Sequence, residues 1–384
     1  GYRDRFSILM EHLRRVSEMA KKYDFELLMW GDMFFRLAGG DYFTNFNQDP
    51  ELGEIPEKIK QLVPENVQLV YWDYFSREQQ RYEKNIDAHN AIKSESWFAG
   101  GLWTWAGFAP HNAFAIATMR EAMRACRAKG VENVVMTMWG DNGAECSKFA
   151  VLPALFMVAQ MARGIDDEET IHANFEKEFG IPFEDFRALD LAGTQNDSAE
   201  AIYNPEKYLL YCDPFMGQFD NRVKPADAAG YADCAARLAV YADHAEYGYL
   251  FRSLRALCAF LSVKADLGIR TRAAYLSGDK KAAKALCTDY DAALERLDAF
   301  YAAYEQQWMH ENKPQGFDVV DLRIGGQRQR LLHCRDRLLA YAEGRLDRIE
   351  ELEEPVLDCC CEETADGKAA RAIFWHEIAS ANVI

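Results

Sequence analysis

The sequence lacks any apolar run long enough to cross a membrane, and no signal peptide opens it. It is also poor in positive charge, because 44 Lys and Arg residues stand against 61 Asp and Glu, a formal net charge of −17. Such an excess of negative charge argues against nucleic acid and anionic membranes as partners. With 384 residues, 49% of them hydrophobic, the chain can bury large cores, and we expect two domains.

Several catalytic signatures are missing as well. The sequence has no Ser-His-Asp order, no phosphate-binding loop and no HExxH motif, so hydrolases of those types have no support. Its ten cysteines form no CxxC pairs, which is typical of free thiols in a reducing compartment and predicts a cytoplasmic protein. The run Cys359-Cys360-Cys361 has no further His or Cys at ligand spacing, so we expect no metal and no other cofactor.

What the sequence does contain is a short apolar run that ends at tryptophan, and it occurs four times. The last copy runs from Val134 to Trp139 and continues as Gly140-Asp141-Asn142-Gly143-Ala144-Glu145. The earlier copies end at Trp30-Gly31-Asp32, Tyr71-Trp72-Asp73 and Trp103-Thr104-Trp105. Runs this short indicate buried parallel strands rather than helices. Ligands of parallel α/β folds lie at the carboxyl ends of such strands, where these aromatic and acidic residues stand.

Predicted helices separate the predicted strands, and a Ser76-Arg77-Glu78-Gln79 capping box is expected to open one of them. Residues 1–163 therefore have the α/β pattern of half a (β/α)8 TIM-type barrel. Four strands cannot close such a barrel, so either four more strands precede Gly1 or two copies pair. The chain begins in mid-pattern, and we expect its natural amino terminus upstream of Gly1. Exposed strand edges would favour homo-oligomers. The predicted helices span residues 5–22, 76–93, 113–129 and 153–163.

Residues 164–384 are predicted to form a mainly α-helical second domain. Apolar residues at helical spacing indicate a bundle packed on the barrel. The polar stretch from Trp308 to Gly326 is expected to be a loop that clasps bundle to barrel. The predicted helices of this domain span residues 226–248, 250–276, 280–308 and 326–348.

If the strands are neighbours, their tryptophans converge at one mouth. Indole rings there would form an apolar box for one sugar ring and an acetamide methyl group, with two or three rings lining it and the others packing the barrel top. Asp73 and Asp141 are candidates to bind sugar hydroxyls, whereas Asp32 and Glu145 are either ligands or caps. Tyr71 is a candidate donor to a substrate carbonyl, although alternation turns Tyr71 and Asp73 away if Trp72 faces inward. The five converging tryptophans are Trp30, Trp72, Trp103, Trp105 and Trp139. His111, in a strand-end loop, is a further candidate.

The segments Ala99 to Gly107 and Thr137 to Glu145 resemble the second half of a glycoside hydrolase family 20 barrel, and the stretch from Asn312 to Gly326 resembles the helical region that follows in some members. The resemblance implies that residues 1–163 are strands 5–8 of the catalytic barrel. Trp139 matches the pocket tryptophan of the last strand, Asp141 the neighbouring acidic residue that holds sugar hydroxyls, and Trp30 the tryptophan of the fifth strand. The family's Tyr-x-Asp of the seventh strand has no match, because Trp103-Thr104-Trp105 stands there.

The resemblance implies an exo-β-N-acetylhexosaminidase without a metal, acting on glycans that end in N-acetylhexosamine. In this family the substrate's acetamide oxygen attacks the anomeric carbon, while an Asp-Glu pair after the fourth strand orients the acetamide and transfers protons. No such pair stands at a strand end here, so we expect the acid and base upstream of Gly1 and the chain alone to be inactive. Two other readings stay open: a non-catalytic carbohydrate-binding protein and a helical interaction module whose tryptophans are core.

Overall fold

The computed structural model describes residue 3 and residues 5–37, 60–61, 63–194, 196–356 and 371–379. The triple-cysteine run lies outside these residues. The chain forms two compact units. We call the first, Gly1–Leu102 with Ala115–Thr137 and Ala154–Ile171, the sheet unit, and the second, Trp103–Phe114 with Met138–Pro153 and His172–Ile384, the helical unit. Within the described ranges, no helix has the length and apolar character that a membrane span requires.

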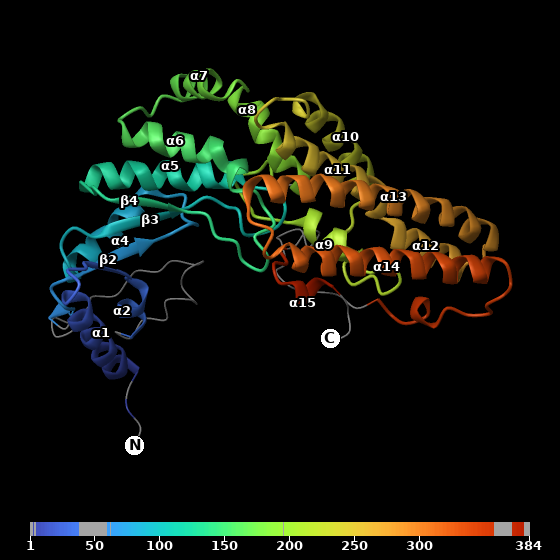
Figure 1. The fold of residues 1–384 in the computed structure, drawn as a ribbon, viewed down its shortest axis with the longest axis horizontal. Coiled ribbons are helices and arrows are strands. Elements are labelled where there is room, and N and C mark those ends of the chain that lie inside the picture. Colours follow the sequence, from blue (N-terminus) through green and yellow to red (C-terminus); the bar gives the residue numbers. More distant parts are fainter. Residues whose placement is uncertain are drawn as a thin grey trace. The chain divides into compact units, whose positions relative to one another are not determined.

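The sheet unit contains four parallel strands in the order β1-β2-β3-β4 (Figure 1). All four predicted strands are confirmed, but β3 stops before Trp103, so that both tryptophans of that copy follow the strand instead of ending it. The mostly helical chain with its small parallel sheet is compatible with the α/β class. The strands are β1 (Leu27–Trp30), β2 (Val67–Trp72), β3 (Trp97–Gly101) and β4 (Val134–Thr137).

One face of the sheet carries the core of this unit. Val67 and Leu69 alternate onto that face and pack with Met10 and Leu13 of α1. Gly100 lets α5 approach β3, because a Cβ at this position would lie 2.3 Å from the sulfur of Met119. The helices of this unit are α1 (Arg5–Lys21), α2 (Asp32–Leu37), α4 (Gln79–Ile92), most of α5 (Asn112–Lys129) and most of α6 (Leu152–Ala162).

The other face of the sheet is more open to solvent. Leu28 and Trp30 on β1 alternate with Leu27 and Met29, and Val135 lies on the same face of β4 through the parallel register. Their exposed fractions are 49%, 40% and 40% for Leu28, Trp30 and Val135. A parallel sheet usually has both faces covered, so these apolar side chains mark a face without full cover.

The predicted capping box at Ser76 is wrong. The helix α4 begins only at Gln79, and its cap residue Glu78 makes no side-chain capping bond. Ser76 Oγ instead accepts the backbone N–H of Glu78 at 3.3 Å, and the Gln79 amide donates to Glu83 one turn ahead. Two residues of turn therefore separate the serine from the helix it was expected to cap.

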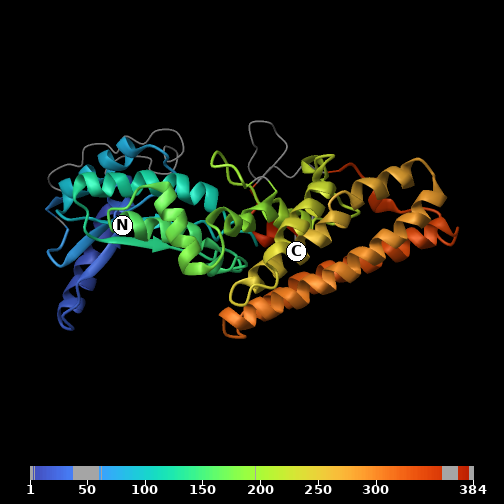
Figure 2. The same cartoon turned by 90° about the horizontal axis from the view of Figure 1, so that it is seen from above.

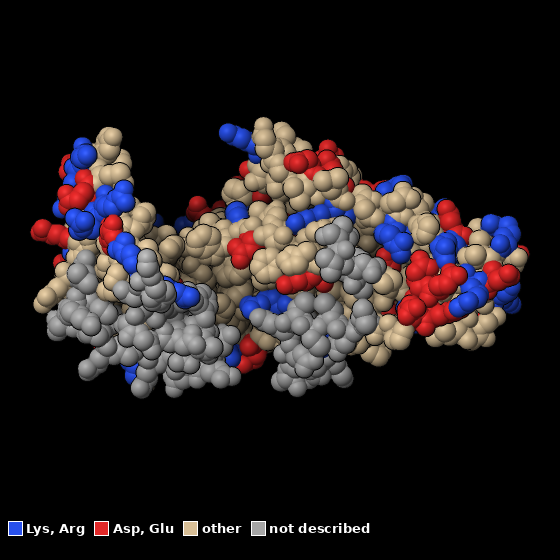
Figure 3. All heavy atoms as spheres, turned by 90° about the horizontal axis from the view of Figure 1, so that it is seen from below, with Lys and Arg blue, Asp and Glu red and all other residues tan. Residues whose placement is uncertain are grey.

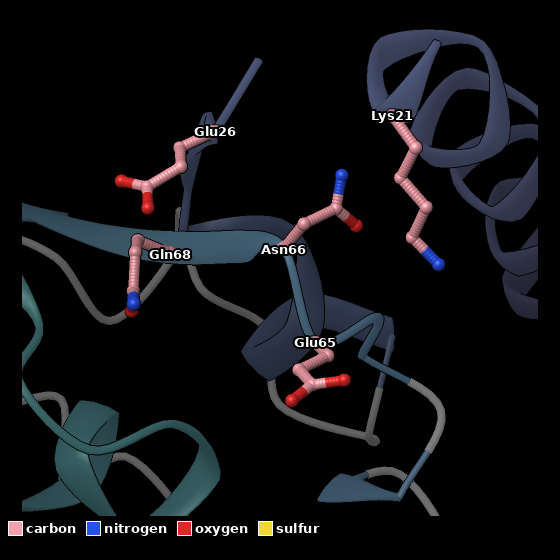
Figure 4. Close-up of a pocket in the computed structure, with 5 residues that line it drawn as sticks. All are labelled: Lys21, Glu26, Glu65, Asn66 and Gln68. Atoms are coloured by element: carbon pink, nitrogen blue, oxygen red, sulfur yellow. The ribbon is translucent and has the colours of Figure 1, made fainter. Parts of the chain in front are cut away.

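A cavity of about 250 Å³ lies at the amino-terminal beginnings of β1 and β2 (Figure 4). Glu26 precedes β1, while Asn66 and Gln68 stand at the start of β2. Asn66 is fixed by Ser17, whose hydroxyl donates to its side-chain oxygen at 2.5 Å. The cavity therefore lies at the amino-terminal end of the strands, whereas the predicted site residues come from their carboxyl-terminal ends. In barrel enzymes of parallel strands, residues at the amino-terminal end contribute to stability and ligands bind at the carboxyl-terminal end.

The helical unit is built on α11, which packs against α10 and α13, while α13 packs against α14. The longest of the described helices is α13, seen in orange in Figure 2. Basic and acidic side chains intermingle over the helices at the right of Figure 3. The helices are α8 (Phe183–Phe186), α9 (Pro205–Tyr211), α10 (Asp227–Leu238), α11 (Gly248–Lys264), α12 (Leu267–Leu276), α13 (Lys280–Glu311), α14 (Phe317–Ala342) and α15 (Trp375–Ile378), with α7 (Glu168–Phe179) at the unit boundary.

Several predicted helix boundaries in this unit are wrong. The helix expected over 226–248 ends at Leu238, and the one expected over 250–276 is two helices with a break at Ala265–Asp266. The expected loop from Trp308 to Gly326 is mostly helical, since only residues 312–316 are irregular. Gly316, with φ +97°, makes the sharp turn, and Phe317 then packs its ring 5.8 Å from that of Trp308.

Candidate functional site

The helical unit contains the segments that directly follow β3 and β4. These two segments carry five predicted site residues: Trp103, Trp105, Trp139, Asp141 and Glu145. After β3, the ring of Trp103 lies 4.3 Å from that of Trp105 between centroids and edge-on to Phe114 at 5.4 Å. Trp103 is 1% exposed and Trp105 is 7% exposed. We call this pair of closely packed, almost fully buried rings the tryptophan wall.

After β4, Trp139 and Asp141 reach solvent. Trp139 is 39% exposed and Asp141 is also exposed. The carbonyl of Trp139 accepts two hydrogen bonds, from Thr104 Oγ1 at 2.7 Å and from Lys148 Nζ at 2.6 Å, and Lys148 also donates to Thr104 at 3.1 Å. These bonds tie the two strand-end segments to each other, so an exposed indole, a carboxylate, a hydroxyl and an ammonium group occur in one place.

Lys148 is the polar residue that sequence reasoning missed here. Partial burial lowers the pKa of its ammonium group. Two of its hydrogens serve Trp139 and Thr104, which leaves one N–H for another acceptor. No local pattern points to it, because it follows Trp139 by nine positions and belongs to a short 3-10 turn, Lys148–Val151.

The loop that carries Asp141 has an unusual backbone. Asn142, Gly143 and Ala144 all have positive φ angles, of 53°, 132° and 51°. For alanine the left-handed region costs about 1 kcal/mol or more, so the surroundings must hold this conformation. Gly140 is needed because a Cβ there would lie 2.7 Å from the Cβ of Ala144, whose N–H donates to the Gly140 carbonyl at 3.1 Å.

Glu145, at the end of this loop, is 4% exposed and paired on both sides. Its carboxylate lies 2.5 Å from Lys207 Nζ and 3.1 Å from Arg323 Nη1, and its carbonyl accepts the Tyr304 hydroxyl at 2.9 Å. Lys207 is itself fully buried. This geometry gives Glu145 a supporting role, the cap-like alternative to a sugar ligand.

Trp30, Asp32, Tyr71, Trp72 and Asp73 belong to the sheet unit. Trp30 ends β1 with 40% of its surface exposed, Trp72 ends β2 half-buried, and Asp32 begins α2 with 8% exposed. Tyr71 and Asp73 are each 1% exposed, and the Tyr71 hydroxyl donates to Asp73 at 3.0 Å.

The polar groups of Tyr71 and Asp73 are occupied within the sheet unit. Asn85 of α4 donates to the Tyr71 hydroxyl at 3.0 Å, and the other oxygen of Asp73 accepts the N–H groups of Phe75 and Ser76. Burial raises the pKa of both Tyr71 and Asp73. The two side chains thus bind each other, and Asn85 of α4 holds the Tyr71 hydroxyl.

His111, the loop histidine, is buried with both ring nitrogens engaged. Nε2 donates to the carbonyl of Ala201 at 2.7 Å, and Nδ1 accepts the N–H of Phe114. Burial lowers its pKa to about 4, so the ring is neutral. The described part of the chain contains no cluster of three metal-ligating side chains, and its seven cysteines are buried.

The comparisons with known proteins bear on the helical part of the chain. Residues 182–371 match the family model described as the Glycoside Hydrolase 20C C-terminal domain. No curated protein matches the chain. The matched segment includes Lys207 and Arg323, which hold the loop of Trp139 and Asp141. Residues 182–371, just under half of the chain, are therefore similar to the carboxyl-terminal domain of glycoside hydrolases of this family.

Proposed function

We propose that this chain supplies part of the sugar pocket of an exo-β-N-acetylhexosaminidase. The observation that carries the proposal is that the loop after β4 exposes both the Trp139 ring and the Asp141 side chain, two positions apart. An indole covers the apolar C–H face of a sugar, and a carboxylate accepts the hydrogens of its hydroxyl groups. The similarity of residues 182–371 to the C-terminal domain of glycoside hydrolases supports this proposal.

In this proposal β1–β4 are strands 5–8 of a (β/α)8 barrel, and residues 164–384 are its helical companion. Trp139 stacks on the terminal sugar, and Asp141 binds its hydroxyls. Trp103 and Trp105 border the acetamide methyl group, with Trp30 and Trp72 as further pocket candidates. Lys148 and Thr104 fix the backbone between the two loops.

The acid and base lie outside this sequence. The substrate's acetamide oxygen attacks the anomeric carbon, a Glu protonates the leaving oxygen and then activates water, and the Asp beside it orients the acetamide. Tyr71, Asp73 and Glu145 are not direct sugar ligands in this scheme, because their polar groups are already bonded within the protein.

An activity assay tests the proposal. The chain alone should leave a chromogenic N-acetylglucosaminide intact, and adding a barrel half that carries the Asp-Glu pair should produce hydrolysis. Turnover by the chain alone would contradict the placement of the acid. Sugar binding without turnover in the reconstituted sample would favour the non-catalytic carbohydrate-binding protein, and neither binding nor turnover would favour the helical interaction module.

A further inference from the structure

We propose that the helical unit sets the geometry of the sugar-binding loops, with Lys207 and Arg323 as positioning residues for Trp139 and Asp141. This inference rests on the proposed function. It assigns a task to the domain that matches the family model, whose long helices carry none of the predicted sugar ligands.

Side chains of the first turn of α9 reach both loops. Asn204 donates through its amide to the carbonyl of Ala106 at 2.7 Å, in the segment after β3. Glu206 accepts the N–H of Ala109 at 3.2 Å from that same segment. Lys207, the next residue, reaches Glu145 in the segment after β4. One short turn therefore fixes the two loops that carry the tryptophan wall and the Trp139–Asp141 pair.

The fit around this turn leaves little room for adjustment. A Cβ on Gly107 would lie 2.3 Å from the Glu206 carboxylate, so the loop after β3 rests directly on α9. Asn204 and Glu206 are fully buried. Because buried polar groups are costly to leave unpaired, a displacement of either loop would break several of these bonds together.

Arg323 on α14 holds the strained loop from its other side. Its guanidinium donates to the Asn142 carbonyl at 2.7 Å, to the Asn142 side-chain oxygen at 3.2 Å and to Glu145 at 3.1 Å. A Cβ on Gly143 would lie 2.8 Å from this guanidinium. Three consecutive residues with positive φ angles keep this backbone conformation only when the surrounding structure holds it. Arg323 and Lys207 provide the bonds that hold it.

The chemistry of this support favours positioning over general stability. A buried ion pair contributes little net stability compared with apolar packing of the same size, because two charges must lose their water. Its directional bonds instead specify one conformation. Asp141 lies one residue before the Arg323 contact at Asn142, so the carboxylate that is proposed to bind sugar inherits its position from this contact.

The experiment compares three single variants of the full chain. Arg323→Lys keeps the charge and removes the fork that binds Asn142, while Lys207→Met removes the buried cation. Arg328→Met is the matched control, since Arg328 is on the same helix and forms an exposed ion pair with Asp298. Amide hydrogen exchange of residues 138–147 and the Kd for N-acetylglucosamine are measured on samples whose helix content matches the wild type.

Arg323→Lys and Lys207→Met should speed exchange in residues 138–147 at least tenfold and raise the Kd at least fivefold, whereas Arg328→Met should change neither. Should Lys207→Met fail to fold, Arg323→Lys alone decides. Exchange equal to that of Arg328→Met, or faster exchange with an unchanged Kd, would overturn the inference. A wild-type chain that ignores the sugar would refute the proposed function, while the exchange data would still report whether the helical unit holds the loop.

Discussion

Asp141 and Glu145 show what a sequence reveals of a single residue. Both are acidic, both follow the same predicted strand, and both were candidate sugar ligands. In the structure Asp141 is exposed, whereas Glu145 is buried between Lys207 and Arg323, 62 and 178 positions away along the chain. Local pattern could place both carboxylates near the strand end. It could not separate their roles, because the partners that decide them come from distant helices.

The buried carboxyl group of Glu206 should make the stability of the protein depend on pH. Burial raises its pKa to about 7, and one of its oxygens has no hydrogen-bond partner. A carboxyl whose pKa is raised on folding binds its proton more tightly in the folded protein. Its contribution to stability is therefore complete below about pH 4.5 and is lost as the pH rises to about 7.

Glu206→Gln should remove this pH dependence. Its free energy of unfolding should equal that of the wild type near pH 4 and exceed it by about 3 kcal/mol at pH 8, because the neutral amide escapes the cost of burying a charge. Urea unfolding between about pH 4 and pH 8 measures this, with the exposed Glu295→Gln as control. Parallel stability profiles of wild type and Glu206→Gln would contradict the assignment.

The sequence predicted the presence of helices and strands more accurately than the residues at which they begin and end. The four strands and most helices are where apolar spacing put them. The helix α5 was expected over residues 113–129 and spans Asn112–Lys129. The predicted helix boundaries are wrong where contacts between distant residues determine the helix end. At Phe317, packing on Trp308 accompanies the extension of α14 into the expected loop. The cap of α5 is a second such case.

Asp190 caps α5 from a remote part of the chain. Its carboxylate accepts the N–H of Asn112 at 3.0 Å, the Asn112 amide at 2.8 Å and the N–H of Ala113 at 2.9 Å, all buried. Nothing near residue 112 in the sequence points to an aspartate 78 positions later.

Asp190→Ala should lower the free energy of unfolding by about 2 kcal/mol, because three buried donors lose their acceptor. Asp167→Ala is the matched control, since Asp167 caps α7 through Thr170 in an exposed setting and should cost less than about 1 kcal/mol. Urea unfolding gives both values, and faster amide exchange at residues 112–116 should accompany the first. Equal costs for the two substitutions would show that Asp190 is no special support.

For the molecule as a whole, periodicity and spacing predicted the α/β class, the parallel strands and a helical carboxyl-terminal region, and the described strands and helices are compatible with that class. The boundary at residues 163/164 stays a prediction. Contacts divide the chain so that the strand-end segments belong to the helical unit, a three-dimensional fact that no linear boundary expresses. Leu28 and Val135 are exposed on the incompletely covered face of the sheet. Self-association of the chain therefore stays a prediction.

The account depends on one claim about the whole molecule: the folded chain holds a site for an N-acetylated sugar at Trp139 and Asp141. The most direct measurement is tryptophan fluorescence during titration with N-acetylglucosamine, compared with glucose, for wild type, Asp141→Asn and the exposed control Asp243→Asn. We predict saturable binding of N-acetylglucosamine over glucose, weakened about tenfold or more in Asp141→Asn and unchanged in Asp243→Asn, since one charge-assisted hydrogen bond contributes about 1.5–3 kcal/mol. This claim would be contradicted if the fluorescence of the folded wild-type chain did not change with N-acetylglucosamine, or if all three proteins bound the sugar with equal affinity.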